Sequence, residues 1–191
     1  MDTVIGIVGK DFVLIAADTA RARSILVLKG DDDKIMHLDS HKLLGASGET
    51  GDAHQFCEYI QKNINFYRFK SDTPLSTEAT ANFTRNQLAT ALRQNPYSVN
   101  LLLGGYDKTG PSLYFLDYLA SMHKMKYAVH GYGGNFLLSI LDNEYKDNMT
   151  LEQVLPILTA CIAELKVRFL INLPKFIVKV VDQDGIRILD F

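Results

Sequence analysis

The sequence predicts two pairs of consecutive helices, and runs of short strands precede, separate and follow the two pairs. The first pair is predicted at about Asp52–Arg68 and after Ser76 or Thr77, and the second after Gly134 and from Thr150 onward. Parallel sheets need a crossover between successive strands, usually a single helix, so paired helices argue against a parallel sheet. We therefore expect an α+β fold, a four-layer αββα sandwich of two antiparallel sheets flanked by helix pairs.

The predicted strands are short apolar or β-branched runs, and most of them face each other across turn sequences. The expected hairpins pair Thr3–Val8 with Phe12–Ala17, Ile25–Leu28 with Lys34–Leu38, Val99–Tyr106 with Ser112–Leu116, and Phe176–Val181 with Ile186–Leu189. Lys42–Ala46 is predicted as a further strand that ends in a glycine-rich turn. Because no linker, repeat or low-complexity segment interrupts this pattern, a single domain over residues 1–191 is expected.

The last predicted helix has the clearest signals of a start and of a buried face. Thr150 and Gln153 have the spacing of a capping box. Its apolar stripe recurs at spacings of three and four and consists of Val154, Leu158, Cys161, Leu165 and Phe169. The two cysteines, Cys57 and Cys161, both lie in helical patterns, and we interpret them as reduced core residues.

Composition and spacing limit the partners that this chain is expected to have. The net charge of −2 offers no reason to expect nucleic acid or an anionic membrane. No apolar run approaches the roughly 20 residues of a membrane helix, and the start does not resemble a signal peptide. The five histidines are His37, His41, His54, His123 and His130. Since none of them has metal-ligand spacing, neither a metal nor another cofactor is expected.

Several stretches of this sequence resemble the β-type subunits of the proteasome. They are Ala16–Thr19, Asp32–Ile35, Gly45–Glu49, Gly51–Asn63, Asn100–Asp107, Leu116–Ala120, His130–Gly133 and Phe169–Pro174. The resemblance implies the fold of the N-terminal nucleophile hydrolases. It also implies a place in a 28-subunit barrel of four stacked rings in the cytoplasm and nucleus, with other proteasome α and β subunits as partners. The resemblance further implies that this chain would interact with a regulatory particle only as part of the whole complex.

In active members of this family the mature chain begins with a threonine that lies four residues before a glycine. Counting back four residues from Gly6 leads to Asp2, so a carboxylate replaces the nucleophilic hydroxyl. Asp18 and Lys34 match the family's aspartate and lysine, which assist the threonine's hydroxyl and amine. Without a nucleophile beside them, we expect Asp18 and Lys34 to form only an ion pair that joins the first two hairpins.

The other catalytic positions implied by the resemblance differ here as well. Tyr132 stands where active members have a serine between glycines, and Phe169 and Asn172 stand where they have an aspartate and a serine. Asp2, Asp18, Lys34, Tyr132, Phe169 and Asn172 are therefore expected to be vestigial positions of a non-catalytic subunit. Gly48 lies in a turn whose counterpart in active members helps to bind the substrate backbone and the oxyanion. Here Gly48 is expected only to form the strand-to-helix turn, and Asp52 to cap the helix.

The alternative is an autonomous hydrolase that acts through Thr3. Side chains alternate along a strand, so a shift of one residue would point the Thr3 hydroxyl to the wrong face of its sheet. With Met1 present, Asp2 is also expected to carry an amide and not a free amine. A non-catalytic subunit is therefore the preferred interpretation.

A group of aromatic and methionine side chains lies around a long predicted connection. Its members are Tyr114, Tyr118, Met122, Met125 and Tyr127. They are expected either to face a neighbouring subunit or to fold back on their own sheet.

Overall fold

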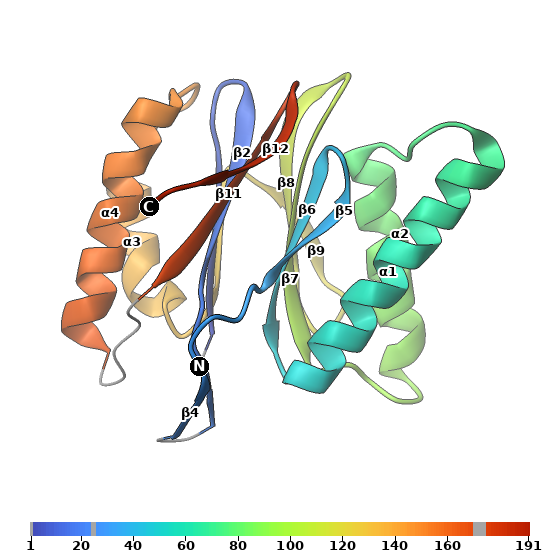
Figure 1. Cartoon of the computed structure of the whole chain (residues 1–191), viewed down its shortest axis with the longest axis horizontal. Helices are drawn as coiled ribbons and strands as arrows, with labels where there is room; N and C mark the ends of the chain where they lie inside the picture. The colour runs from blue at the N-terminus through green and yellow to red at the C-terminus, as the bar shows by residue number, and fades with distance from the viewer. Residues whose placement is uncertain (1, 24–25, 170–174) are drawn as a thin grey trace.

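The computed structural model describes residues 2–23, 26–169 and 175–191, and this part of the chain forms twelve strands and four helices. Two five-stranded antiparallel sheets pack face to face, and a pair of helices covers the outer face of each (Figure 1). The predicted α+β class and the four-layer αββα order are confirmed.

The first sheet has the strand order β10-β1-β2-β11-β12. Its strands are β1 (Thr3–Val8), β2 (Phe12–Asp18), β10 (Tyr127–Gly131), β11 (Phe176–Asp182) and β12 (Gly185–Leu189). Helices α3 (Gly134–Glu144) and α4 (Leu151–Arg168) pack on its outer face. The predicted capping box is present at the start of α4, where the Thr150 amide donates to Gln153 Oε1 over 2.9 Å.

The second sheet has the order β5-β6-β7-β8-β9. Its strands are β5 (Ile35–Asp39), β6 (Lys42–Gly48), β7 (Val99–Asp107), β8 (Gly110–Leu116) and β9 (Met122–Met125). Helices α1 (Thr50–Ser71) and α2 (Thr77–Leu92) cover its outer face. Ser76 caps α2 by accepting a hydrogen bond from the Ala79 amide.

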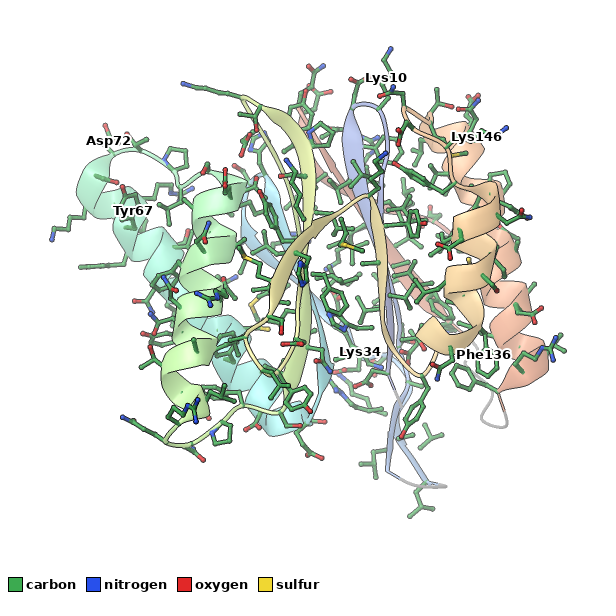
Figure 2. The ribbon with its side chains drawn as sticks, turned by 180° about the vertical axis from the view of Figure 1, so that it is seen from behind. Lys10, Lys34, Tyr67, Asp72, Phe136 and Lys146 are labelled. Atoms are coloured by element: carbon green, nitrogen blue, oxygen red, sulfur yellow. The ribbon has the colours of Figure 1, made fainter. Side chains whose placement is uncertain are left out.

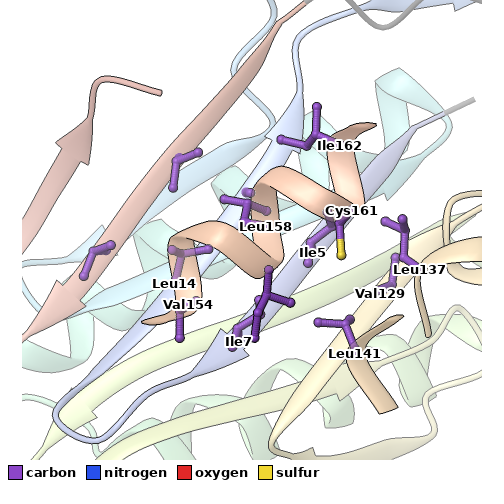
Figure 3. Packing of buried hydrophobic residues seen from close by; sticks show 14 of the residues in the cluster. Ile5, Ile7, Leu14, Val129, Leu137, Leu141, Val154, Leu158, Cys161 and Ile162 are labelled. Carbon is purple, nitrogen blue, oxygen red and sulfur yellow. The ribbon is translucent and has the colours of Figure 1, made fainter. Parts of the chain in front are cut away.

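Buried residues form three apolar layers because the central strands are covered on both faces. Val13 and Ile15 of β2 face the second sheet, whereas Leu14 and Ala16 of the same strand face α3 and α4. Figure 3 shows Leu14 of β2 and Leu158 of α4 among the residues of this outer layer. Cys57 and Cys161 are free and buried in different layers, as the core interpretation requires.

One predicted hairpin is wrong. Residues 26–29 form β4 (Leu26–Lys29), which pairs with β3 (Arg21–Arg23) and not with residues 34–38; Ile25 lies outside the described residues. β5 instead pairs with β6 in the second sheet. The reason is that Lys34 is drawn into the interior by buried carboxylates, so the chain passes from the β3–β4 hairpin into the other sheet.

The predicted long connection contains two strands that the sequence patterns did not reveal. β9 and β10 are separated only by Lys126, yet β9 lies at the edge of the second sheet and β10 at the edge of the first. β9 is largely exposed, which hides the apolar alternation of a half-buried strand. Of the aromatic group, Tyr114 folds back into the core, whereas Tyr118 and Met125 are exposed.

His130 of β10 connects the two sheets through its imidazole. Nε2 donates to the Leu101 carbonyl of β7 over 3.0 Å, and the ring stacks on Phe115 of β8 with 4.1 Å between centroids. Burial lowers the pKa of His130 from its ordinary value of 6.5 to about 4. The folded chain therefore holds this imidazole in the neutral form at neutral pH.

This geometry predicts a loss of stability in mild acid. His130 binds a proton more readily in the unfolded chain than in the folded one. Its contribution to the free energy of unfolding is therefore fully present above pH 6.5 and decreases as the pH drops toward 4. The free energy of unfolding should decrease there by at most about 1.4 kcal/mol per pH unit. Urea unfolding measured between pH 7 and pH 4 checks this. The His130→Gln variant keeps an N–H donor but does not titrate, so its pH profile should be flatter; an unchanged slope would contradict the assignment.

Candidate functional site

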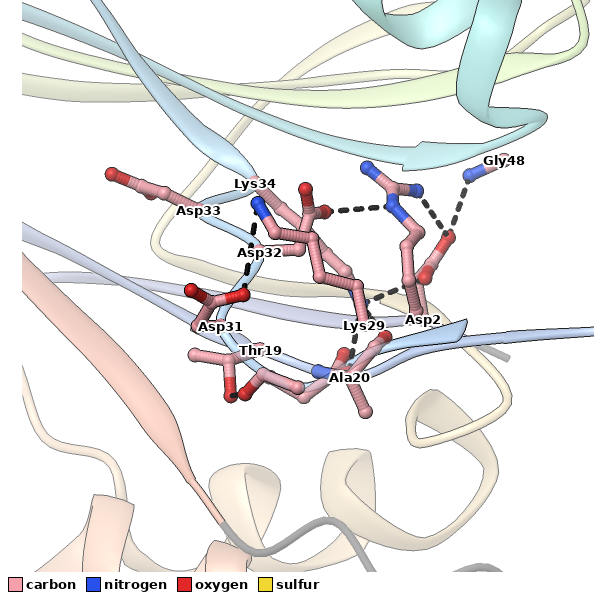
Figure 4. A network of polar contacts seen from close by, with 12 residues as sticks. Asp2, Thr19, Ala20, Lys29, Asp31, Asp32, Asp33, Lys34 and Gly48 are labelled. Atoms are coloured by element: carbon pink, nitrogen blue, oxygen red, sulfur yellow. Dashed lines mark hydrogen bonds and ion pairs between the residues drawn. The ribbon is translucent and has the colours of Figure 1, made fainter. Parts of the chain in front are cut away.

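The buried ammonium group of Lys34 forms the centre of the candidate site (Figure 2). Its Nζ donates to Asp2 Oδ1 and Asp18 Oδ2, each over 2.7 Å, and to the Ala20 carbonyl over 2.8 Å. An ammonium has three protons to donate, so these three acceptors use all of them. Figure 4 shows the cluster between the start of β1, the end of β2 and the segment that leads into β5.

Asp18 lies at the end of β2 and is fully buried. Besides Lys34, its carboxylate accepts hydrogen bonds from the Thr3 amide over 2.7 Å and from the Ala20 amide over 3.1 Å. Burial raises the pKa of Asp18, and the nearby Lys34 ammonium opposes that shift. The predicted ion pair is present, and it ties the first strand to the chain that leads into the second sheet.

Asp2 makes contacts that sequence reasoning did not anticipate. While Oδ1 binds Lys34, Oδ2 accepts a hydrogen bond from the Gly48 amide over 3.1 Å and lies 3.9 Å from the Arg21 guanidinium. Burial acts to raise the pKa of Asp2, but Lys34 and the Gly48 amide outweigh it and hold the pKa below its usual value. This carboxylate therefore accepts hydrogen bonds from both the Lys34 ammonium and the backbone amide of Gly48.

Two glycines let the backbone close tightly around Asp2. Gly131 has a φ of 88°, and a Cβ on it would lie 1.8 Å from the Asp2 carbonyl oxygen. Gly48 has a φ of 130°, and a Cβ there would lie 2.2 Å from the Ser98 carbonyl oxygen. Only glycine tolerates both the positive φ and the close approach. The expected turn role of Gly48 is thus accompanied by a direct contact with Asp2.

A cavity of about 280 Å³ opens beside Asp2. Its lining residues are Asp2, Ser47, Gly48, Glu49, Ser98, Asn100, Gly131 and Tyr132. Tyr132 is exposed at this cavity and lines it together with Asp2. Ser47 is buried, and its hydroxyl has no partner in the described structure.

Thr3 does not line this cavity. Its side chain is fully buried and its hydroxyl has no hydrogen-bond partner among the described residues. A Cβ on Gly133 would lie 2.6 Å from Thr3 Cγ2, so the turn after β10 packs directly on this side chain. The Thr3 hydroxyl is therefore enclosed on the side of the sheet away from the cavity, in the direction that strand alternation predicts.

Phe169, another predicted position, lies apart from the cluster. Phe169 ends α4 and packs edge-on against Phe136 of α3, with 5.9 Å between ring centroids. Asn172 lies outside the described residues. The prediction that Asp52 caps α1 is wrong, because α1 begins at Thr50 with Glu49 in the N-cap position. Asp52 lies in the first turn, and its carboxylate accepts a hydrogen bond from the Ser98 amide over 2.8 Å.

A second set of charges beside the cluster was not predicted. Arg21 Nε lies 2.7 Å from Asp32 Oδ2, and the buried Lys179 of β11 donates to Asp33 Oδ2 and to the Ile35 carbonyl, each over 2.6 Å. The available signal was a single lysine within the apolar strand that ends at Asp182. A lysine at such a position needs a buried partner, but the sequence does not say which carboxylate supplies it.

The described part of the chain brings no three histidine, cysteine, aspartate or glutamate side chains together in a metal-binding arrangement. Among the helices in the same residues, none is both long enough and apolar enough to cross a membrane.

The cluster predicts a large cost for removing its cation. Lys34→Met would leave Asp2 and Asp18 buried without a partner, and the free energy of unfolding should fall by about 3–5 kcal/mol. Lys62→Met is the matched control, since Lys62 forms an exposed pair with Glu58, and it should leave the free energy of unfolding nearly unchanged. Urea unfolding of both variants makes the comparison, and equal losses would contradict a structural role for the cluster.

Comparison with known proteins places this arrangement in a family. The family model described as proteasome subunit matches residues 1–181. The proteasome subunit beta type-2 of Oryza sativa subsp. japonica is 53% identical over 188 residues, which cover 98% of this chain and 89% of the relative.

Two further relatives of this kind have somewhat lower identity. The proteasome subunit beta type-2 of Dictyostelium discoideum is 46% identical, over 100% of this chain and 98% of the relative. The proteasome subunit beta type-4 of Saccharomyces cerevisiae is 44% identical over the same shares of the two chains. The family match and these full-length similarities agree with the sandwich fold, and the chain therefore belongs to the proteasome subunit family.

Proposed function

We propose that this chain is a non-catalytic β subunit of the 20S proteasome core particle, at the type-2 position, which is the fourth in the β ring. The observation that carries this proposal is the carboxylate of Asp2, bound to both Lys34 and the Gly48 amide. Those two groups would otherwise be free to assist a nucleophile and a developing oxyanion. With its pKa held low, the Asp2 carboxylate stays ionised and keeps both occupied.

The remaining groups support the same proposal. Peptide hydrolysis by this family's chemistry needs a hydroxyl nucleophile with a base beside it. Asp2 has no hydroxyl, all three protons of Lys34 are donated to other acceptors, and Tyr132 and Phe169 cannot replace a serine and an aspartate. The enclosed position of the Thr3 hydroxyl disfavours the alternative of a hydrolase that acts through Thr3.

The role that remains is architectural. We propose that the chain contacts neighbours within its ring, an α subunit, and the opposite β ring, and that it forms part of the chamber wall. The particle would degrade unfolded and ubiquitin-tagged proteins by ATP-dependent proteolysis in the cytoplasm and nucleus. Its catalytic threonines would lie on other β subunits.

Labelling of assembled particles tests the absence of catalysis. A threonine-directed epoxyketone or β-lactone should modify other β subunits, which serve as the positive control, and leave this chain unmodified because it lacks an accessible hydroxyl beside an amine. Mass spectrometry of the separated subunits gives the readout. A covalent adduct on this chain at Thr3 would overturn the proposal.

A substitution tests whether the missing hydroxyl is the only defect. We expect Asp2→Thr to leave the subunit inactive, because Tyr132, Phe169 and Asn172 are unchanged. Peptidase activity is measured in assembled particles whose other sites are blocked by an irreversible inhibitor, with Asp2→Asn as the control that also removes the carboxylate. Activity that appears in Asp2→Thr and not in Asp2→Asn would show that the surrounding scaffold remains competent.

A further inference from the structure

The β3–β4 hairpin stands apart from the rest of the fold. It forms a separate two-stranded sheet that joins neither five-stranded sheet. Figure 1 shows β4 extending beyond the body of the sandwich, on the side where β1 begins. An isolated two-stranded hairpin is marginally stable in water, so a hairpin in this position needs support from other contacts.

The apolar side chains of β4 point away from the core of this chain. Leu26, Val27 and Leu28 are 63%, 60% and 68% exposed. Across the described strands, no other strand has more than one large apolar residue exposed to this degree; β12, for example, has only Ile188. Single exposed apolar residues are ordinary, but a consecutive group of them marks an interaction site.

The root of the hairpin, in contrast, is held firmly by the polar cluster. Arg21 of β3 binds Asp32 over 2.7 Å, and Lys34 donates to the carbonyl of Ala20, directly before β3. On the opposite side, Thr19 Oγ1 donates to the Gly30 carbonyl over 2.9 Å, and the Asp32 amide donates to the Thr19 carbonyl over 2.9 Å. Both ends of the hairpin are thus fixed to the groups around Asp18 and Lys34.

From these contacts we propose that the β3–β4 hairpin is an assembly element whose residues Leu26–Leu28 insert into an uncharged apolar groove on a neighbouring, different proteasome subunit. The vestigial catalytic cluster then serves to hold the root of this hairpin in place. This inference rests on the proposed function, since it needs a multi-subunit particle. It adds the surface that makes one contact and the chemistry of the partner's groove.

The absence of charge on residues 26–28 predicts that the groove is uncharged and that it belongs to a different subunit. Residues 26–28 carry no charge, and the adjoining Lys29 already has Asp31 within 3.7 Å. An apolar cavity of about 460 Å³ between β9, β10 and α3 of this chain is bordered by Lys124, Lys126 and Asp142. Lys126 already pairs with Asp147 and Asp142 accepts a hydrogen bond from Tyr127, but Lys124 has no carboxylate partner within the described residues. Because the hairpin residues have no group to pair with Lys124, a second copy of this chain is a poor match.

A competition experiment tests the proposal in assembled particles. Tagged wild-type chain is co-expressed with an equal amount of the Val27→Asp variant, and the ratio of the two chains in purified particles is measured by mass spectrometry. We expect the variant to be at least tenfold depleted, because its carboxylate must enter an apolar groove. Val27→Ile, which keeps the apolar character, should be incorporated like wild type.

Val167→Asp is the matched surface control. Val167 lies on α4 and is 77% exposed, so the same substitution is made at an exposed valine outside the hairpin. It should enter particles at close to the wild-type ratio. Equal depletion of both aspartate variants, or of neither, would overturn the inference. Val27 is already exposed in the isolated chain, so both variants should unfold at the wild-type urea concentration.

Photo-crosslinking identifies the occupant of the hairpin surface. A photoreactive amino acid at position 28, in purified particles, should link this chain to apolar residues of one other subunit. Links to a second copy of this chain, or to charged loops, would contradict the proposed partner chemistry. If wild-type chain never enters particles, the proposed function fails. If wild type enters and Val27→Asp competes equally, the proposed function stands and only this inference fails.

Discussion

The ion cluster around the Lys34 ammonium connects parts of the chain that would otherwise lie in separate units. Its acceptors come from the residue before β1, the end of β2 and the root of the β3–β4 hairpin, and Lys34 itself leads into the second sheet. A buried charge is expensive unless each of its hydrogen-bonding groups has a partner. The strands can therefore reach their native positions only together, which makes this cluster a condition for the packing of the two sheets.

The contacts of Asp2 explain how the polar groups around the start of β1 are satisfied. Buried polar groups without a partner destabilise a fold. Here the carboxylate accepts from both Lys34 and Gly48, so neither group is left without a partner. The cluster is then available for a structural task, and the β3–β4 hairpin at its border offers one.

Much of the fold follows from local patterns in the sequence. The helix pairs, their caps at Ser76 and Thr150, and the outer hairpins were predictable because each depends on residues close together in the chain. β9 and β10 were not predictable, since an exposed edge strand shows little apolar alternation. The predicted pairing of residues 26–29 was wrong for a related reason. The turn signals around them fit two strand pairings, and only the burial of Lys34 selects between the two.

The sequence by itself determined the order of the elements, the class of the sandwich, and the presence of a carboxylate, Asp2, directly before the first strand. Only the tertiary structure decided what that carboxylate does. Asp2 meets the Gly48 amide across 46 residues of chain, and Lys179 meets Asp33 across 146. Such contacts depend on how the two sheets pack, and side-chain spacing along the chain carries no information about which distant groups become neighbours.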